Sequence, residues 1–307
     1  MSKPQIVVIT GPTAVGKTSL AVGLAQHFQA EIVSADTRQI FRHMDIGTAK
    51  PTKPEQAKTR HHVIDVVAPD QNFDVARYGK MARQAISDIL FRERRAFVVG
   101  GAGLYIRCLT HGLFGGPPAN YTLREELKRK EETQGAGFLF DWLQRVDDKA
   151  AQHIHCNDKM RILRALEVWL LTGTPMSVLQ DAHSFQEQPY EVLYIRLNRS
   201  RDELCNRIAK RCFSMVREGF VEEVRKLLGM GYSQELPALR TIGYAQISEM
   251  LNGNITLEDA IEITVRQTCR LAKRQMTWLR SDRVHQWYEP SLQGKIVDTM
   301  ERFFDRS

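Results

Sequence analysis

The stretch that most constrains the fold is GPTAVGKT at residues 11–18, which matches the pattern G-x-x-x-x-G-K-[ST]. The run Ile6 to Thr10 before it is typical of a buried strand, and Leu20, Leu24 and Phe28 after it recur at helical spacing. Glycines let such a loop curl so that successive backbone N–H groups point inward, and the start of the following helix adds partial positive charge. The stretch therefore predicts a phosphate-binding loop between a strand and a helix.

Two side chains of this loop have specific chemical roles in that interpretation. Lys17 would place a full positive charge against a terminal phosphate, and the hydroxyl of Thr18 is a candidate ligand for Mg²⁺. The loop residues that we expect to bind phosphate are Gly11, Pro12, Thr13, Ala14, Val15, Gly16, Lys17 and Thr18.

The first third of the chain alternates between strand and helix patterns. Residues 31–36 (EIVSAD) and 96–101 (AFVVGG) are typical of strands, and residues 78–95 are typical of a helix. This alternation predicts an α/β fold with a parallel sheet covered on both faces. Asp36 closes the strand after the loop's helix, and parallel strands bring their carboxyl ends to one edge of the sheet. We therefore expect Asp36 to face the loop.

The pattern changes at residues 112–120 (GLFGGPPAN), which are rich in turn formers. Helices without strands are predicted at 122–133, at 138–153, and from Asn157 as N-cap to Leu171. The segment EVLYIRL at 191–197 is again typical of a strand, and helices follow to about Arg283. The sequence thus predicts an α/β core at 1–114 and 189–290, interrupted by a helical insert at 115–188, with a C-terminal tail at 291–307.

The chain is moderately basic, with 43 Lys and Arg against 36 Asp and Glu, a net charge of +7 and a pI near 9.2. Part of this charge lies in one segment, where Val265, Cys269, Ala272, Met276 and Leu279 form an apolar helical face. No acid interrupts residues 265–281, which favours phosphate contact over an ordinary solvated face. We interpret Trp278 as a core residue. Arg266, Arg270, Lys273 and Arg280 lie on a stripe beside the apolar face, and Arg274 lies further round the helix. The cations that we expect to contact phosphate, called the basic ridge, are Arg266, Arg270, Lys273 and Arg274.

Five cysteines with no CxxC pair indicate neither a disulfide framework nor a zinc site. His153, His155 and Cys156 are close in sequence, but a metal site there is disfavoured. The N-terminus has no signal-peptide pattern, and no apolar run approaches about 18 residues. We expect a cytoplasmic monomer without membrane contact.

Several longer motifs occur in order after the loop. They are SADTRQIFRHMDIGTAKP, HHVIDVVAPD, VVGGAGLYIRCLTHGL, NDKMRILRALEVW, RTIGY and LAKRQMTWLR. Together with GPTAVGKT, they resemble the tRNA dimethylallyltransferases, also called tRNA isopentenyltransferases. The resemblance covers most of the chain, from about Ile6 to Trp287, and MDIGTAKP and AKRQMTWLR are far more specific than the phosphate loop.

The resemblance implies a nucleotide-kinase-like core whose loop holds dimethylallyl diphosphate with Mg²⁺, rather than ATP. The acceptor would be the exocyclic N6 amine of the adenosine just 3′ of the anticodon, and the helical insert would grip the anticodon stem-loop of the tRNA. Asp36 matches the family's general base, and Arg211 matches an arginine that stabilises the leaving diphosphate.

The resemblance also implies which residues contact the tRNA. The target base must leave its stack to react, and the segment from Asp36 to Gln39 matches the part that reads it. A glutamine side chain carries the donor and acceptor that an adenine edge needs. The matching positions, apart from the basic ridge, are Asp36, Thr37, Arg38, Gln39, Ala102, Arg124, Lys159, Met160, Arg161, Ile162, Leu163, Arg240, Thr241, Ile242, Gly243 and Tyr244.

This chain departs from the family pattern at several positions. Ala102 stands where the family usually has Thr, so a hydroxyl expected near the acceptor amine is missing. One lost hydrogen bond to a reacting centre can cost a few kcal/mol, so the change bears on rate. The other departures bear on RNA affinity, and they are Thr37, Phe41, Ala245 and Cys269.

Two alternative functions remain open at this stage. A small-molecule or nucleotide kinase could use the same loop, but it needs a second acid to hold the metal. The strand at 96–101 ends without an acid, and Asp65 is only a weak candidate. A divergent relative that binds RNA with weakened catalysis is the other alternative, and Ala102 is its main support.

Overall fold

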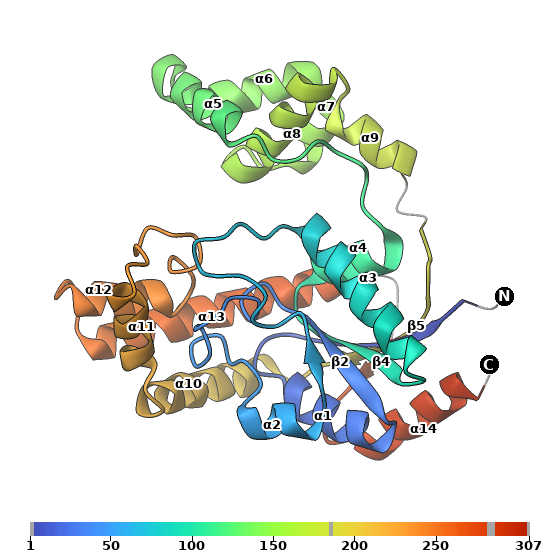
Figure 1. The fold of residues 1–307 in the computed structure, drawn as a ribbon. Helices are drawn as coiled ribbons and strands as arrows, with labels where there is room; N and C mark the ends of the chain where they lie inside the picture. The colour runs from blue at the N-terminus through green and yellow to red at the C-terminus, as the bar shows by residue number, and fades with distance from the viewer. Residues whose placement is uncertain (1–2, 184–186, 281–285, 306–307) are drawn as a thin grey trace. The chain divides into compact units, whose positions relative to one another are not determined.

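The computed structural model describes residues 3–183, 187–280 and 286–305. The chain forms two compact units, which Figure 1 shows as ribbons. Unit 1 comprises Met1–Thr110 and Gln188–Ser307, and unit 2 comprises His111–Glu187. The sequence placed the junctions after residues 114 and 188. Each unit is described by itself below.

Unit 1 is built on a six-stranded sheet with the order β3-β2-β4-β1-β5-β6. Every neighbouring pair is parallel, with Ile6 opposite Ala96 on one side of β1 and Val192 on the other. The predicted parallel α/β core is therefore confirmed. The strands are β1 (Gln5–Thr10), β2 (Ala30–Ala35), β3 (His61–His62), β4 (Arg95–Gly100), β5 (Glu191–Leu197) and β6 (Trp287–Tyr288).

Alternate residues of the central strands point into two separate cores. Ile6 and Val8 of β1 pack into one core with α3 (Val75–Phe91) and α4 (Gly103–His111). Val7 and Ile9 pack into the other with α1 (Lys17–His27) and α14 (Gln293–Phe304). Both faces of β1 are buried, as its uninterrupted apolar run predicts.

The end of the chain belongs to the core and is not a separate tail. Ile296, Met300 and Phe303 of α14 are buried against the sheet face that α1 also covers. The segment that the sequence left as a C-terminal tail, with a terminal helix as its main signal, does form a helix, and its described part, residues 291–305, packs on the core. A short amphipathic helix gave too weak a signal to reveal this packing.

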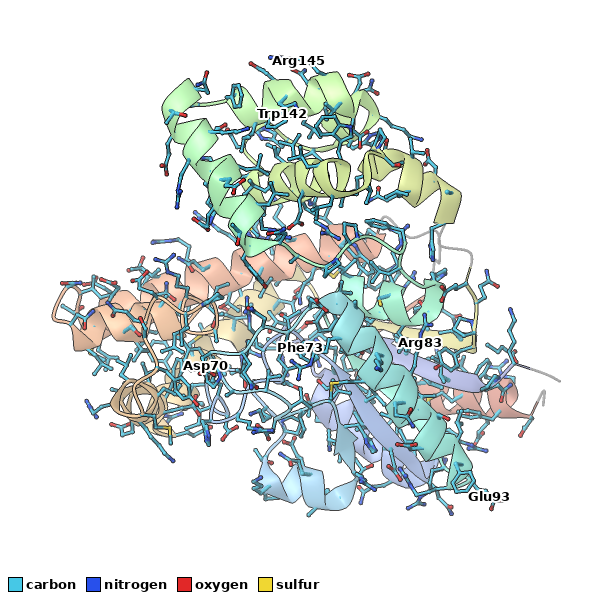
Figure 2. All side chains as sticks on the ribbon, turned by 45° about the horizontal axis from the view of Figure 1, so that its top comes forward. Asp70, Phe73, Arg83, Glu93, Trp142 and Arg145 are labelled. Atoms are coloured by element: carbon cyan, nitrogen blue, oxygen red, sulfur yellow. The ribbon has the colours of Figure 1, made fainter. Side chains whose placement is uncertain are left out.

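Most of the remaining helices of unit 1 form a group on one side of the sheet (Figure 1). Arg83 of α3 donates to the carbonyl oxygen of Cys108 on α4 at 3.2 Å, which ties these two helices together (Figure 2). The remaining helices are α2 (Lys53–Lys58), α10 (Arg201–Arg217), α11 (Phe220–Gly229), α12 (Tyr244–Leu251) and α13 (Leu257–Arg280). The predicted end near Arg283 lies outside the described residues.

Unit 2 is helical and has its own apolar core, in which Trp142 and Trp169 meet edge to face at 6.1 Å (Figure 2). The single helix predicted at 138–153 is two helices, because Asp147 accepts from Ala150 N at 3.0 Å and caps the second one. Asp158 caps the helix that begins at Lys159, where the sequence indicated Asn157 as the cap. The helices are α5 (Tyr121–Gln134), α6 (Phe138–Val146), α7 (Asp148–His153), α8 (Lys159–Thr172) and α9 (Met176–His183).

No single helix in the described ranges has the length and apolar character to cross a membrane; α8 and α9, bent by 85°, meet those criteria only as a pair.

Candidate active site

A cavity of about 510 Å³ opens beside the carboxyl ends of β1 and β2 in unit 1. Its lining includes both candidate catalytic residues and part of the loop, so the structure brings together groups that are distant in the sequence. The residues that matter for the chemistry are Thr13, Lys17, Thr18, Asp36 and Arg211.

The loop has the conformation that its glycines predict. Gly16 has φ +107°, a left-handed value that favours glycine, and it precedes α1. At Gly11, an added Cβ would lie 2.8 Å from the carbonyl oxygen of Leu197. Lys17 Nζ donates to the carbonyl oxygens of Gly11 and Pro12 at 3.0 and 2.9 Å. Desolvation by burial lowers the pKa of Lys17 to about 8, with the Asp36 carboxylate opposing the shift and Arg211 adding to it.

Three side chains from the C-terminal half of the chain fix the loop from outside. Arg207 Nε donates to Ala14 O at 2.7 Å, and Arg199 Nε donates to Val15 O at 3.0 Å. Gln275 Oε1 accepts from Thr13 N at 2.8 Å. The sequence analysis did not identify these three residues. Two of them carried a signal, because Arg207 precedes Arg211 by one helical turn and Gln275 lies in the motif LAKRQMTWLR.

Arg211 approaches the loop from α10. Its Nη2 donates to the hydroxyl of Thr13 at 2.9 Å. Its Nε is buried and has no hydrogen-bond partner within the described part of the chain. Burial lowers the pKa of the Arg211 guanidinium, while Cys212 and Asp36 oppose this shift. An arginine remains protonated nonetheless, so an incompletely paired cation lines the cavity beside the phosphate loop.

Asp36 lies directly after β2 and lines the same cavity. Its Oδ1 accepts from Arg38 N at 2.8 Å and from Gln39 N at 3.3 Å, which fixes the carboxylate in a tight turn. Its Oδ2 accepts no hydrogen bond from the residues that the structure describes. One oxygen therefore orients the group, and the other can accept a proton.

The other residues of this turn differ in their accessibility. Thr37 and Arg38 are exposed. The amide of Gln39 is used inside the protein, because it accepts from Ser34 Oγ at 3.1 Å and donates to Ala49 O at 3.1 Å. Ala102 N donates to Ala35 O at 3.1 Å, which places Ala102 next to the turn.

The MDIGTAKP segment also lines the cavity, and a carboxylate of α11 holds it. Glu223 accepts from the N–H groups of Asp45, Ile46 and Gly47 at 2.9, 2.7 and 3.1 Å. At Gly47 an added Cβ would lie 2.1 Å from the ring of Phe220, so only glycine fits. Sequence reasoning singled out the motif but not its partner Glu223.

The acid that a kinase would need is occupied by another partner. Asp65 accepts from the buried Lys50 Nζ at 2.5 Å, and Lys50 also donates to Asp45 at 2.5 Å. Within the described residues, no group of three or more His, Cys, Asp or Glu could hold a metal, and this includes the His153–Cys156 segment.

Several of the expected tRNA contacts in unit 2 have structural partners. Glu167 is 0% exposed and accepts from Arg124 Nη2 at 2.8 Å and from Arg164 Nη1 at 2.6 Å. Ile162 and Leu163 are buried in the core of this unit. Exposed positions are Lys159, Met160 and Arg161 at the start of α8.

Among the expected tRNA contacts at residues 240–244, some side chains are exposed and others are buried. Arg240 is exposed and forms an ion pair with Glu235. Thr241 and Tyr244 are buried, and the Tyr244 hydroxyl donates to Glu223 at 2.6 Å. The other two residues are Ile242, which is half-buried, and Gly243, which precedes α12.

The basic ridge lies on α13 and presents its cations to solvent. Arg270, Lys273 and Arg274 are exposed, and Arg266 donates to Glu262 at 3.3 Å. Trp278 is 38% exposed and its ring lies against Gly103, so its interpretation as a core residue is only partly right.

The fold and cavity define a class of protein, namely P-loop α/β enzymes whose loop and cations hold phosphate groups. The family model described as IPP transferase matches residues 39–282. The chain belongs to the IPP transferase family and is an enzyme of the prenyltransferase class. The resemblance found in the sequence is therefore confirmed.

The chain is similar to proteins with related names over nearly its whole length. It is 46% identical to a tRNA dimethylallyltransferase of Geobacter sulfurreducens, over 99% of this chain and 98% of that protein. The structure matches the tRNA isopentenylpyrophosphate transferase of Bacillus halodurans at a TM-score of 0.71, with 37% identity and 98% of both chains covered. It also matches a eukaryotic dimethylallyltransferase acting on tRNA at a TM-score of 0.77, with 26% identity over 90% of this chain and 70% of that one.

Proposed function

We propose that this protein transfers a dimethylallyl group from dimethylallyl diphosphate to the N6 amine of the adenosine 3′ to the anticodon of tRNA. The proposal is supported by the family and by relatives named for dimethylallyl transfer to tRNA. The observation that carries it is the convergence of Lys17, Asp36 and Arg211 on one cavity.

Asp36 supplies the base in this mechanism. An adenine amine is a poor nucleophile because its lone pair is delocalised into the ring. As the new N6–C1 bond forms, the amine loses a proton to Asp36 Oδ2. This oxygen, unlike Oδ1, accepts no hydrogen bond from the described residues. A positioned carboxylate contributes roughly 10²–10⁴-fold to such a step.

The cations of the cavity act on the leaving group. The C1–O bond breaks and its electron pair passes to the diphosphate, which leaves with added negative charge. Lys17, Arg211 and the inward N–H groups of the loop stabilise that charge. The Nε of Arg211, which has no hydrogen-bond partner among the described residues, provides a donor for a diphosphate oxygen.

A magnesium ion fits the groups present in the cavity. Mg²⁺ binds proteins through one or two oxygen ligands and completes its coordination with phosphate oxygens and water. Thr18 and Asp36 line the cavity together and offer oxygen atoms. When bound, the ion would neutralise charge on the diphosphate, and the hydroxyl of Thr18 is the protein ligand that we propose.

The acceptor side of the proposal involves the turn after β2 and the basic ridge. Arg38 and Thr37 are exposed beside the base, whereas Gln39 holds the turn in place through Ser34 and Ala49. We therefore assign Gln39 a supporting role in place of direct reading of the adenine edge. The ridge cations Arg270, Lys273 and Arg274 would contact tRNA phosphates.

Incubation of the protein with dimethylallyl diphosphate, Mg²⁺ and an anticodon stem-loop with adenosine at the position 3′ to the anticodon tests the proposal. Mass spectrometry should show the RNA heavier by one dimethylallyl group. RNA that binds without this gain would favour the RNA-binding relative suggested by Ala102. Phosphoryl transfer from labelled ATP would favour a kinase.

A further inference from the structure

A single side chain joins the two loops that follow β1 and β4. Gln275 of α13 accepts from Thr13 N at 2.8 Å through Oε1, and it donates to Gly101 O at 3.2 Å through Nε2. β1 and β4 are adjacent strands, so both loops lie at the same edge of the sheet. The amide of Gln275 therefore bridges two loops of the active site.

Each of these loops carries one half of the proposed chemistry. On the loop after β1, the hydroxyl of Thr13 accepts from Arg211, the arginine that we assign to the leaving diphosphate. On the loop after β4, Ala102 N donates to Ala35 O, and Ala35 directly precedes Asp36. The bridge thus links the part that holds the donor to the part that carries the base.

The packing around the bridge leaves no room for a side chain at Gly101. An added Cβ there would lie 2.5 Å from Nε2 of Gln275 and 3.3 Å from the carbonyl oxygen of Gly11. Gly101 has no left-handed backbone angle, so a larger residue could be placed here only by displacing the amide of Gln275. The close approach of the two loops and the amide is built into the fold.

Only an amide side chain of this length can serve both loops at once. A carboxylate can accept from Thr13 N but cannot donate to Gly101 O, and a thioether can do neither. We infer that Gln275 is a positioning residue that sets the separation between the bound diphosphate and the acceptor amine. This inference rests on the proposed function.

The expected effect is on the transfer step more than on binding. Two substrates held by different loops react well only when their reacting atoms are aligned, and a displacement of about 1 Å can reduce the rate roughly 10²-fold. Loss of the bond to Gly101 alone should therefore lower kcat and change both KM values much less.

Two substitutions separate the two halves of the bridge. Gln275→Glu keeps the bond to Thr13 and loses the one to Gly101, so we expect kcat to fall about 10- to 100-fold. Its added negative charge beside the loop should weaken binding of Mg²⁺ and inorganic diphosphate by a smaller factor. Gln275→Met loses both bonds, so diphosphate affinity should fall as well. Amide exchange at Thr13 should rise in the methionine variant only.

A control and a second route to the same change complete the test. Gln267→Met, about two turns earlier on α13, should leave kcat unchanged. Gly101→Ala should displace the amide and lower kcat to a similar degree. Combined with Gln275→Glu, it should lower kcat little further, because both changes break the same contact between Gln275 and Gly101.

Different outcomes would overturn different claims. A kcat within threefold of the native value in Gln275→Glu would overturn the bridge while leaving the proposed function intact. Equal losses in kcat, in both KM values and in melting temperature would mark Gln275 as merely structural. Absence of transfer by the native protein would overturn the proposed function itself, and amide exchange at Thr13 would still report whether the bridge forms.

Discussion

Two arginine clusters in this molecule differ in how completely their charges are paired. In unit 2, Arg124 and Arg164 both donate to Glu167, which also accepts from Asn120 N at 2.6 Å. In unit 1, Arg207 and Arg211 donate to neutral oxygens of the phosphate loop, Ala14 O and the hydroxyl of Thr13, and the buried Nε of Arg211 has no partner in the described part of the chain. The paired cluster stabilises its unit, whereas the incompletely paired one is suited to bind an anion.

The largest effect is expected at the base beside the incompletely paired cluster. Asp36→Asn keeps the shape of the side chain but removes its proton-accepting charge, so the transfer rate should fall roughly 10²–10⁴-fold. Single-turnover kinetics with excess enzyme would measure this loss.

Binding measurements sharpen that result. RNA and diphosphate affinities of Asp36→Asn should remain within a few-fold of the native values, and exposed Asp70→Asn serves as the control. Full activity in Asp36→Asn would remove this residue from its proposed role.

Breaking the paired cluster should cost stability. Arg124→Met leaves the fully buried Glu167 with Arg164 and Asn120 N as partners, so the loss should be about 1–3 kcal/mol of the free energy of unfolding. Urea denaturation would measure it. Arg129→Met, on the exposed face of the same helix, should change the free energy of unfolding by less than about 0.5 kcal/mol.

The same cluster predicts how the loss depends on pH. Burial favours the neutral form of Glu167, but hydrogen bonds from Arg124 and Arg164 outweigh it, so the pKa of Glu167 lies below its ordinary 4.5. A lowered carboxyl pKa contributes stability above the ordinary value, and this contribution is lost as pH falls through the native value. The difference between native protein and Arg124→Met should therefore shrink in acid. A difference that is independent of pH would contradict the ion pair.

Removing the incompletely paired Arg211 should reduce activity and not stability, the opposite of Arg124→Met. Arg211→Met should lower kcat by about 10²–10³-fold, the usual cost of one lost donor to a developing anion. Its free energy of unfolding should hold or rise, because a buried cation without a carboxylate partner is removed. A stability loss as large as that of Arg124→Met would end the contrast between the two clusters.

The basic ridge offers a graded test of exposed charge. Lys273→Ala and Arg274→Ala should each weaken RNA binding at all sequences and reduce the slope of log affinity against log salt by about 1. Arg266→Ala should have a smaller effect, because Arg266 is paired with Glu262. Filter binding over a salt series would compare the three variants with the native protein. Slopes equal to the native slope in all three variants would exclude the ridge as a phosphate contact.

Diphosphate binding should depend on pH through Lys17. The pKa of Lys17 is lowered to about 8, so its amine is charged below that pH and neutral above it. Affinity for Mg²⁺ and inorganic diphosphate should fall as pH rises beyond 8, approaching about tenfold per unit. Lys17→Arg keeps its charge over this pH range, so any pH dependence in this variant measures the titration of diphosphate itself. Equal pH profiles in both proteins would contradict the lowered pKa.

Local patterns predicted the elements that depend on neighbours in the sequence. The loop at 11–18, the strand before Asp36 and the alternation of strands and helices all follow from spacing and turn chemistry. β3 and β6 have two residues each, too few for a periodic pattern to reveal. The break at Asp147 depends on a single capping side chain inside an otherwise helical pattern.

Contacts between distant segments could not be predicted in the same way. Gln275 reaches Thr13 across 262 positions, and Arg207 reaches Ala14 across 193. Gln39 has the chemistry to read a base, yet its amide serves the protein's own backbone. A residue type states what a side chain can do, and only the folded chain decides which partner it meets.

The order in which the sheet is assembled has a consequence for synthesis on the ribosome. The loop at 11–18 emerges first, but β5 beside β1 begins at Glu191, after the whole of unit 2 has been translated. The side chains that hold the loop, Arg199, Arg207 and Gln275, follow later still. Nascent chains that stop before unit 1 resumes therefore carry the phosphate motif without its supports, so ligand binding can begin only when translation is nearly complete.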